Sequence, residues 1–218
     1  MPRRTFHWNE FAMDNAGRAS REVMFLRLYP AAVLGLILFC AAKLDGADFR
    51  SGALIPTLKA PDFALKASSG SEFRLSRYRG KVVILSFGYT SCPDVCPTTL
   101  ANLASLRRKL AADADRVQVA YVTVDPERDT AERLRAYTSI FDTTFLGLTG
   151  SADQLAAVRK AYGVSSQKEI VDKGTGFYLI HHSASIYFID SAGTLRVIAP
   201  FGTPLDDLIH DARILLER

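Results

Sequence analysis

Two cysteines, Cys92 and Cys96, are the residues whose type and spacing most clearly suggest chemistry in this chain. They stand in the segment FGYTSCPDVCP, residues 87–97, at the end of an apolar run. Three residues separate them, so their sulfurs lie about one turn apart if a helix begins within the segment. A helix N-terminus stabilises thiolates, which are both nucleophiles and ligands for soft metals. The pair therefore predicts either metal binding or thiol–disulfide chemistry.

The cysteine content argues against a framework of structural disulfides. The chain has only three cysteines, and its 218 residues are enough to bury a core without such bonds. Dithiol oxidoreductases of the thioredoxin kind place two residues between their cysteines, whereas this segment has three. The spacing leaves metal binding and thiol exchange open. A peroxidase is less favoured, because no arginine is clearly placed to activate peroxide.

Histidines are the best source of a further metal ligand. All three methionines, at positions 1, 13 and 24, precede the folded part of the chain. His210 falls off the apolar stripe of the last predicted helix, and we expect it to be solvated. His181 and His182 are neighbours in a strand-like segment, so their side chains point to opposite faces. At most one of the two is therefore expected to face the cysteines.

Two thiolates and one imidazole favour copper among the common metals. This set suits Cu(I), and Cu(II) when a weak ligand is added. A structural zinc site normally has a fourth protein ligand, for which only Asp94 and Asp125 are candidates.

A predicted strand and a predicted helix position the cysteine segment. Residues 81–89 are almost continuously apolar, as expected for a central strand that is buried on both faces. Pro97 fits the first turn of a helix, and leucines at 100, 103, 106 and 110 form one apolar stripe. Further strands are expected at 117–124 and 144–150, and further helices at 130–141, 151–163 and from 204 onward.

The order of these elements predicts an α/β domain with a thioredoxin-like fold. Residues 62–80 show a hairpin pattern, and residues 177–202 contain a late hairpin around an Asp-Ser-Ala-Gly turn. Alternating strands and helices between them indicate a central mixed sheet with helices on both faces. The position of the cysteine pair after the first long strand makes the arrangement thioredoxin-like by analogy.

The first part of the chain predicts a membrane anchor. The stretch 28–42 is uncharged, and with the apolar residues before Arg27 it reaches about twenty residues, enough to cross a bilayer. Arginines precede it, so we expect a cytoplasmic tail at 1–23, an anchor at 24–43, a linker at 44–59 and a folded domain at 60–218. A cleaved signal peptide and lipidation at Cys40 are alternatives, the latter disfavoured by the bulky Phe39.

The charge pattern does not indicate a nucleic-acid-binding protein. The formal net charge is +4, and basic residues are not interleaved with aromatic ones. The tight basic cluster Arg107, Arg108 and Lys109 falls within a helical pattern, where we expect it on a solvated face.

Three segments together resemble the SCO/SenC family of cytochrome c oxidase assembly proteins. They are FGYTSCPDVCP, VTVDPERDT at 122–130 and HHSASIYFID at 181–190. The resemblance covers the chain from about residue 60 to its end and includes the anchor layout. It implies a thioredoxin-like domain that is held at the bacterial inner membrane by a single span and faces the periplasm. It also implies that the protein binds one copper ion and helps deliver it to the CuA centre of oxidase subunit II.

The same resemblance assigns roles to individual residues. It implies copper ligands at Cys92, Cys96 and His182, the last because the segment after it aligns with the family pattern Asp-His-Ser/Thr. His181 occupies the usual Asp position, which is a departure from the family. His181 and Asp125, the latter in the family's Asp-Pro-x-Arg-Asp-Thr segment, are candidate neighbours of the ligands.

An alternative function and further partners also follow from the resemblance. The two cysteines would serve equally in a thiol–disulfide oxidoreductase that reduces the cysteines of the CuA site. Another periplasmic copper chaperone or a thiol reductant is a further candidate partner.

Overall fold

The computed structural model describes residues 49–217. The predicted cytoplasmic tail, the predicted anchor and Cys40 lie outside the described residues. From residue 49 to residue 217, no helix has both the length and the apolar character needed to cross a bilayer.

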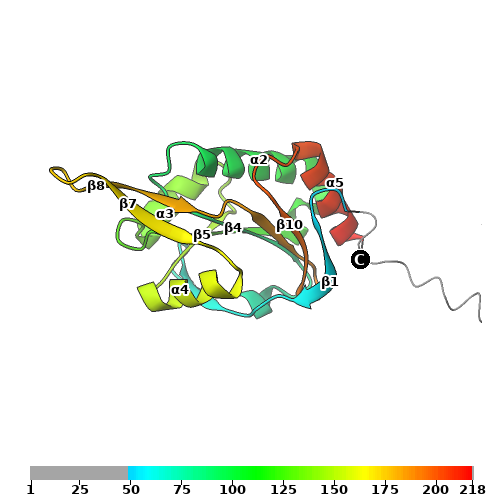
Figure 1. Ribbon diagram of the computed structural model, residues 1–218. Coiled ribbons are helices and arrows are strands. Elements are labelled where there is room, and N and C mark those ends of the chain that lie inside the picture. Colours follow the sequence, from blue (N-terminus) through cyan, green and yellow to red (C-terminus); the bar gives the residue numbers. More distant parts are fainter. Residues whose placement is uncertain (1–48, 218) are drawn as a thin grey trace, which may run out of the picture. The chain divides into compact units, whose positions relative to one another are not determined.

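One mixed sheet forms the centre of the domain (Figure 1). Its strands are β1 (Ala53–Lys59), β2 (Ala64–Ala67), β3 (Glu72–Arg74), β4 (Val82–Gly88), β5 (Val117–Thr123), β6 (Leu146–Thr149), β9 (Ile186–Ile189) and β10 (Thr194–Ala199). From edge to edge the order is β1-β10-β9-β4-β5-β6-β2-β3. Strands β4, β5 and β6 are parallel, and the other neighbours are antiparallel.

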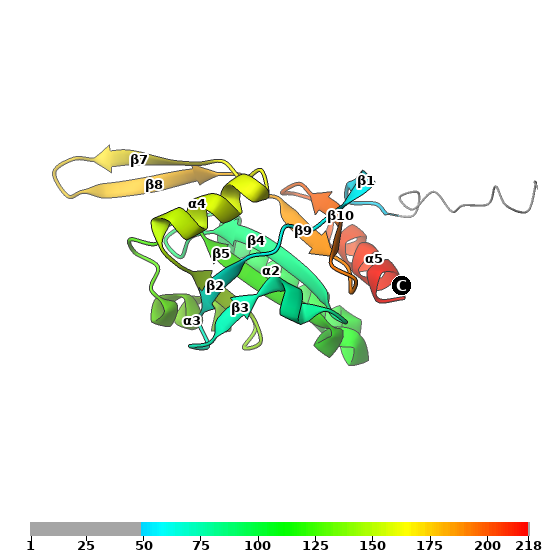
Figure 2. The same ribbon diagram turned by 90° about the horizontal axis from the view of Figure 1, so that it is seen from below.

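Helices cover both faces of this sheet, as the sequence predicts. They are α2 (Val95–Leu110), α3 (Ala131–Ser139), α4 (Ala152–Ala161) and α5 (Leu205–Leu216), with short 3₁₀ helices η1 (Leu75–Tyr78) and η2 (Ala111–Arg116). Helices α2 and α5 lie together on one face, and α4 lies on the other (Figures 1 and 2). The expected N-caps form, since the hydroxyls of Thr130 and Ser151 each accept a backbone N–H of the first helical turn. The predicted α/β fold with a mixed central sheet is confirmed.

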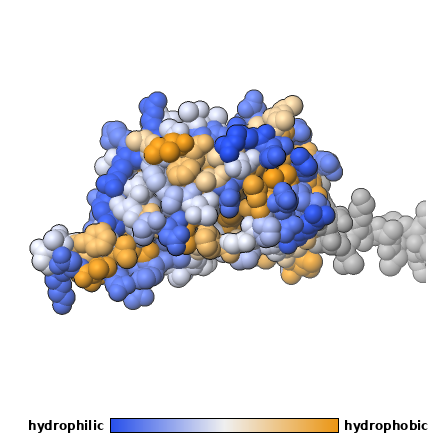
Figure 3. Space-filling model, turned by 90° about the horizontal axis from the view of Figure 1, so that it is seen from above, coloured by the Kyte–Doolittle hydropathy of each residue, from blue (hydrophilic) through white to orange (hydrophobic). Residues whose placement is uncertain are grey.

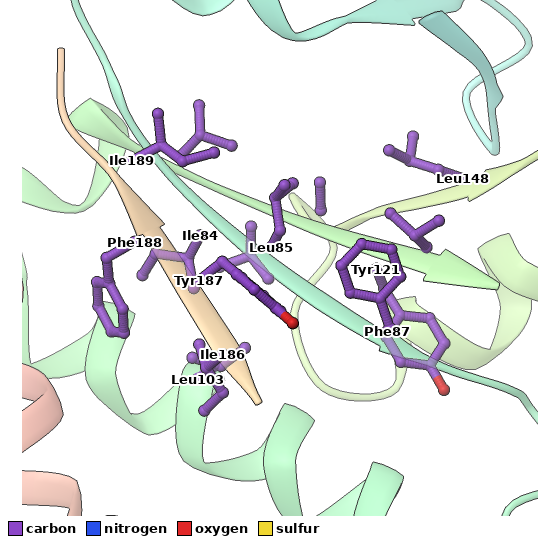
Figure 4. Close-up of a cluster of buried hydrophobic side chains, with 14 of the residues drawn as sticks. Ile84, Leu85, Phe87, Leu103, Tyr121, Leu148, Ile186, Tyr187, Phe188 and Ile189 are labelled. Carbon is purple, nitrogen blue, oxygen red and sulfur yellow. The ribbon is translucent and has the colours of Figure 1, made fainter. Parts of the chain in front are cut away.

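Strand β4 is the centre of the core. All seven of its residues are buried, because β4 has a neighbouring strand on each side and the sheet has helices on both faces. Ile84, Leu85 and Phe87 from β4 lie among Tyr121 of β5 and the apolar side chains of β9 (Figure 4). The strand therefore gives a rigid base to the cysteine segment, which follows directly after it.

A second, two-stranded sheet projects from the domain (Figures 1 and 2). It consists of β7 (Ser166–Asp172) and β8 (Phe177–His182), which are antiparallel. The sequence did not predict β7, because SQKEIVD is mostly polar and has no apolar face. In the structure, six of its seven residues are exposed. The predicted late hairpin is formed by β9 and β10 alone, since β8 pairs with β7. Ile170, Val171 and Phe177 of this hairpin are exposed. Figure 3 shows apolar surface among the polar atoms of this projecting part.

The predicted linker is wrong over its second half. Residues 53–59 form β1, which pairs with β10 at the edge of the sheet. Just before β1, the backbone N–H groups of Arg50 and Ser51 donate to the carboxylate of Asp211 on α5, at 2.8 and 2.9 Å. The segment has no alternating pattern of its own, and only the pairing with β10 makes it a strand. The folded part of the chain therefore begins before residue 60.

The expected solvated face at Arg107 is also wrong. Its guanidinium is buried, and it donates to the carbonyls of Ala114 and Val117 and to the carboxylate of Asp142. The two carbonyls belong to the connection between α2 and β5, and Asp142 lies between α3 and β6. The cationic group is buried because it satisfies carbonyls that would otherwise lack donors.

Replacing Asp211 tests whether the N-terminal segment is held by α5. Asp211 is fully buried, so Asp211→Ala leaves two backbone N–H groups without their acceptor and should lower the free energy of unfolding by about 2–3 kcal/mol. Asp207→Ala is the matched control, because Asp207 lies on the same helix and makes only a 3.9 Å ion pair with the exposed Arg50. We expect it to cost less than about 1 kcal/mol in urea unfolding. Equal losses for the two variants would contradict this account of the segment.

Candidate metal centre

The two cysteines lie where β4 passes into α2. Helix α2 begins at Val95, so Cys96 is helical and Cys92 belongs to the loop before it. Gly88, the last residue of β4, allows this close packing, because a Cβ atom there would lie 2.6 Å from the Cys96 sulfur. The predicted strand–helix junction is confirmed, although only one of the cysteines lies on the helix.

His182 meets the cysteines from the end of β8. Its Nε2 atom is 3.3 Å from the Cys96 Sγ atom, and the ligand atoms of Cys92, Cys96 and His182 lie within 4.8 Å of one another. Both cysteines are free thiols. The Nδ1 atom of His182 is 3.0 Å from the carbonyl oxygen of Ser183, to which it donates when protonated. This tautomer leaves Nε2 with a lone pair directed at the sulfurs.

The neighbouring histidine points away, as expected for adjacent residues of a strand. The His181 side chain is 66% exposed, and its Nε2 atom contacts the carboxylate of Glu169 on β7. Our expectation that His181 is a neighbour of the ligands is therefore wrong. Strand geometry explains this, because the pleat that turns His182 inward turns His181 to the outer face of the hairpin.

The other candidate residues lie outside the cluster. Asp125 is buried, and its carboxylate accepts a 2.8 Å hydrogen bond from the Tyr178 hydroxyl instead of reaching the sulfurs. Asp94 is exposed at the start of α2. His210 is half-buried on α5, where its Nδ1 atom is 3.1 Å from the carboxylate of Asp211, so it is less solvated than expected.

Tyr89 is a residue of this site that sequence reasoning missed. Its hydroxyl accepts a 3.2 Å hydrogen bond from the backbone N–H of Ile180 on β8. Its ring meets the His182 ring edge to face, with 6.0 Å between the ring centroids. Tyr89 belongs to the cysteine segment itself, and this position could have marked it as a candidate for the site. The sequence could not show its contact with the β7–β8 hairpin.

The two thiols have very different acidities. A hydrogen bond from Cys96 lowers the pKa of Cys92 to about 3, although burial opposes this effect. The backbone N–H groups of Asp94 and Cys96 lower it further. The same interaction with the Cys92 thiolate, together with burial, raises the pKa of Cys96. In the reduced protein, Cys92 is the thiolate and Cys96 keeps its proton.

The fold and these three ligand atoms define the class of this molecule. It is a thioredoxin-like domain with two thiols and one imidazole gathered at the end of a central strand. The SCO1/SenC family model matches residues 54–217, and the chain belongs to this family.

Known relatives share both the sequence and the fold. The mitochondrial SCO2 homolog of Mus musculus is 32% identical over 199 residues, which are 87% of this chain and 78% of the mouse protein. The structure of Bradyrhizobium japonicum ScoI with copper bound is 32% identical, with a TM-score of 0.66, and the match covers 72% of this chain and 99% of that chain. BsSco is described as a member of the Sco family of cytochrome c oxidase assembly proteins and as having a disulfide switch. It is 25% identical, with a TM-score of 0.58 and coverage of 74% and 95%.

The lowered pKa of Cys92 predicts unusual reactivity at acid pH. In the reduced, metal-free protein, Cys92 should react with iodoacetamide almost as fast at pH 5 as at pH 7, because it stays ionised above a pKa of about 3. An ordinary thiol with a pKa of about 8.5 would slow about 100-fold over the same interval. The rate is measured by mass spectrometry of the Cys92 peptide.

The Cys96→Ala variant is the control for this measurement. It removes the main hydrogen bond to the Cys92 sulfur, so the pH dependence should move toward that of an ordinary thiol. A 100-fold loss of rate at pH 5 in the unmodified protein would show that Cys92 is not the thiolate.

Proposed function

We propose that this protein binds one copper ion through Cys92, Cys96 and His182. The observation that carries the proposal is the cluster of their three ligand atoms within 4.8 Å. Among residues 49–217, it is the one group of three or more His, Cys, Asp or Glu side chains placed to hold a metal ion.

The chemistry of the donor set favours copper. Two thiolates and one imidazole form a soft set of three, which Cu(I) accepts without a further ligand. A structural zinc ion would want a fourth protein ligand, and neither Asp94 nor Asp125 joins the cluster. The copper-bound state of the similar Bradyrhizobium japonicum protein supports the same choice.

We propose further that the bound copper is cargo and that the CuA centre of cytochrome c oxidase subunit II receives it. Cys96 is buried, whereas Cys92 and His182 are half-buried, so one side of the ligand set is open to an approaching partner. A partner thiolate entering from this side can replace Cys92 and His182 one at a time. Copper then passes between proteins without becoming a free ion. The link of BsSco to cytochrome c oxidase assembly supports this destination.

The proposed location follows from the N-terminal sequence. A single span at 24–43 preceded by arginines would hold the domain on the periplasmic side of the bacterial inner membrane. There it would meet subunit II, and also a periplasmic copper chaperone or a thiol reductant that reloads it.

A thiol–disulfide reductase is the second candidate function, favoured by the ionised Cys92 beside a protonated Cys96. The Cys92 thiolate would attack a disulfide of the CuA site, forming a mixed disulfide and releasing one partner thiolate. Cys96 would then attack the Cys92 sulfur, form the Cys92–Cys96 disulfide and release the second thiolate, which takes up the Cys96 proton. Two electrons pass to the partner, and an external thiol reductant restores the pair. The disulfide switch described for BsSco supports this chemistry.

Substitutions at the cluster test the copper proposal. Cys92→Ala and Cys96→Ala should each abolish stoichiometric copper binding, and His182→Ala should weaken it by more than about 100-fold, because each removes a direct ligand, whereas losing a group that only supports a ligand costs about 10–100-fold. His181→Ala is the matched control and should bind as the unmodified protein does, since its side chain lies on the outer face. Binding is measured by metal analysis and by the thiolate–Cu(II) charge-transfer absorption. Loss of copper in His181→Ala with full binding in His182→Ala would overturn the assignment.

The His182→Ala variant also separates delivery from reduction. When the protein is mixed with a subunit II CuA domain, delivery requires all three ligands, whereas reduction of the oxidised CuA cysteines requires only the two thiols. We therefore expect His182→Ala to fail in copper transfer, followed by CuA absorption, but to reduce the disulfide, followed by thiol trapping. If the unmodified protein reduced the domain but never metallated it, reduction would be the function.

A further inference from the structure

The two halves of the metal centre come from different parts of the fold. The cysteines are attached to β4 in the central sheet, whereas His182 ends β8 in the separate projecting sheet. No strand pairing joins β8 to the central sheet in the described structure. Other contacts must therefore set the distance between the imidazole and the sulfurs.

We propose that the turn Asp125–Thr130, which follows β5, positions both halves of the centre. In this arrangement Asp125 and Arg128 hold the histidine strand, and Asp129 holds the cysteine loop. The inference rests on the proposed function only in taking Cys92, Cys96 and His182 as the ligands. We call Asp125–Thr130 the bracing turn.

Asp125 and Arg128 of the bracing turn contact Tyr178 on β8, and we call these contacts the first arm. The Tyr178 hydroxyl donates to Asp125 at 2.8 Å, and Arg128 Nη1 donates to the Tyr178 carbonyl at 3.1 Å. The Arg128 guanidinium carbon also lies 3.6 Å from the centroid of the Tyr178 ring, and its Nε pairs with the Asp125 carboxylate. Asp125 is only 2% exposed, so these bonds are made in a dry environment where they hold their geometry strongly. Tyr178 is four residues before His182, on the same inward face of the strand.

Asp129 of the bracing turn contacts Thr90, two residues before Cys92, and we call these contacts the second arm. The Asp129 carboxylate is fully buried and accepts the Thr90 N–H at 3.0 Å and the Thr90 hydroxyl at 2.6 Å. It also accepts the hydroxyl of Thr123, the last residue of β5, at 2.6 Å. From the next helix, Arg133 donates to the hydroxyls of Thr90 and Ser91 at 2.7 and 2.9 Å. A buried carboxylate with three donors is costly to disrupt, so it fixes the loop.

The bracing turn itself is short and stiff. The Asp129 N–H donates to the Asp125 carbonyl at 2.9 Å, and Thr130 caps α3 directly afterwards. The turn begins at the end of β5, which pairs with β4 along its whole length. Both arms leave one short turn that is anchored at the end of β5, so their separation is fixed. Tyr89 adds a direct contact between the cysteine segment and β8.

The inference predicts different behaviour for the two arms in double-mutant cycles. Arg128→Gln breaks the first arm and should lower Cu(I) affinity about 10–100-fold, with most of this loss absent in the His182→Ala background, because the contacts with Tyr178 act through His182. Thr90→Val breaks hydroxyl bonds of the second arm and should lower affinity in both backgrounds, because it acts through the cysteines. Affinity is measured by competition with a Cu(I) chelator. Tyr178→Phe, which removes only the hydroxyl bond to Asp125, repeats the first-arm test if Arg128→Gln does not fold.

A matched control excludes a general effect of lost hydrogen bonds. Tyr187→Phe removes a buried tyrosine hydroxyl that donates to the Tyr162 carbonyl at 3.1 Å, away from the bracing turn. It should leave copper affinity unchanged. If Arg128→Gln and Tyr178→Phe weaken binding equally with and without His182, or bind as tightly as the unmodified protein, the positioning role is wrong.

A metal-free measurement separates this inference from the proposed function. In the reduced protein, the nuclear Overhauser contact between the His182 ring and Cys96 should be present, as their 3.3 Å separation requires. It should be lost in the first-arm variants and kept in Tyr187→Phe. If the unmodified protein bound no copper but this contact responded as expected, the proposed function would fail and the bracing turn would stand. An unchanged contact in both first-arm variants would refute the bracing turn alone.

Discussion

The contact between the Cys96 sulfur and the His182 imidazole is the interaction on which the rest of this site depends. It joins residues 86 positions apart and brings together two sheets that share no strand pairing in the described structure. Each half has its own support. Strand β4 is buried along its whole length and presents the cysteines at its end, while the β7–β8 hairpin presents the histidine. Because a metal ligand must be placed within a fraction of an ångström, the buried polar contacts between these supports matter as much as the ligands.

Burial divides the three ligand positions into one protected and two accessible groups. Cys96 lies among core residues, and Gly88 leaves just enough room for its sulfur. Cys92 and His182 are half-buried and lie at the surface end of the cluster. The same asymmetry suits both proposed functions. A copper ion would be held on its buried side by Cys96, and a partner could approach it on the side of Cys92 and His182. For reduction, the ionised Cys92 can attack a partner disulfide while the buried Cys96 keeps its proton.

Local patterns predicted most of the fold because they report which faces of an element are buried and where a helix begins. The apolar run before the cysteines became β4, the leucine stripe became α2, and Thr130 and Ser151 capped their helices as expected. The failures occurred where a partner outside the element decided the outcome, because no pattern within the element reports that partner. The polar strand β7 exists because β8 pairs with it, β1 exists because β10 pairs with it, and Arg107 is buried because nearby carbonyls need a donor.

The sequence by itself determined which groups are available for chemistry. The cysteine spacing, the absence of methionine from the domain and the adjacent histidines narrowed the ligand set to two thiols and one imidazole, and strand alternation allowed only one histidine to face them. Only the tertiary structure showed that His182 is the histidine that contacts Cys96. Only the tertiary structure showed that Asp125 accepts a hydrogen bond from Tyr178 and does not reach the sulfurs. It also decided that the carboxylate of Asp129 accepts hydrogen bonds from the Thr90 N–H and hydroxyl in the cysteine segment. The physical reason is that residue type and spacing specify local chemistry, whereas the partners of a buried polar group come from segments that meet only when the chain folds.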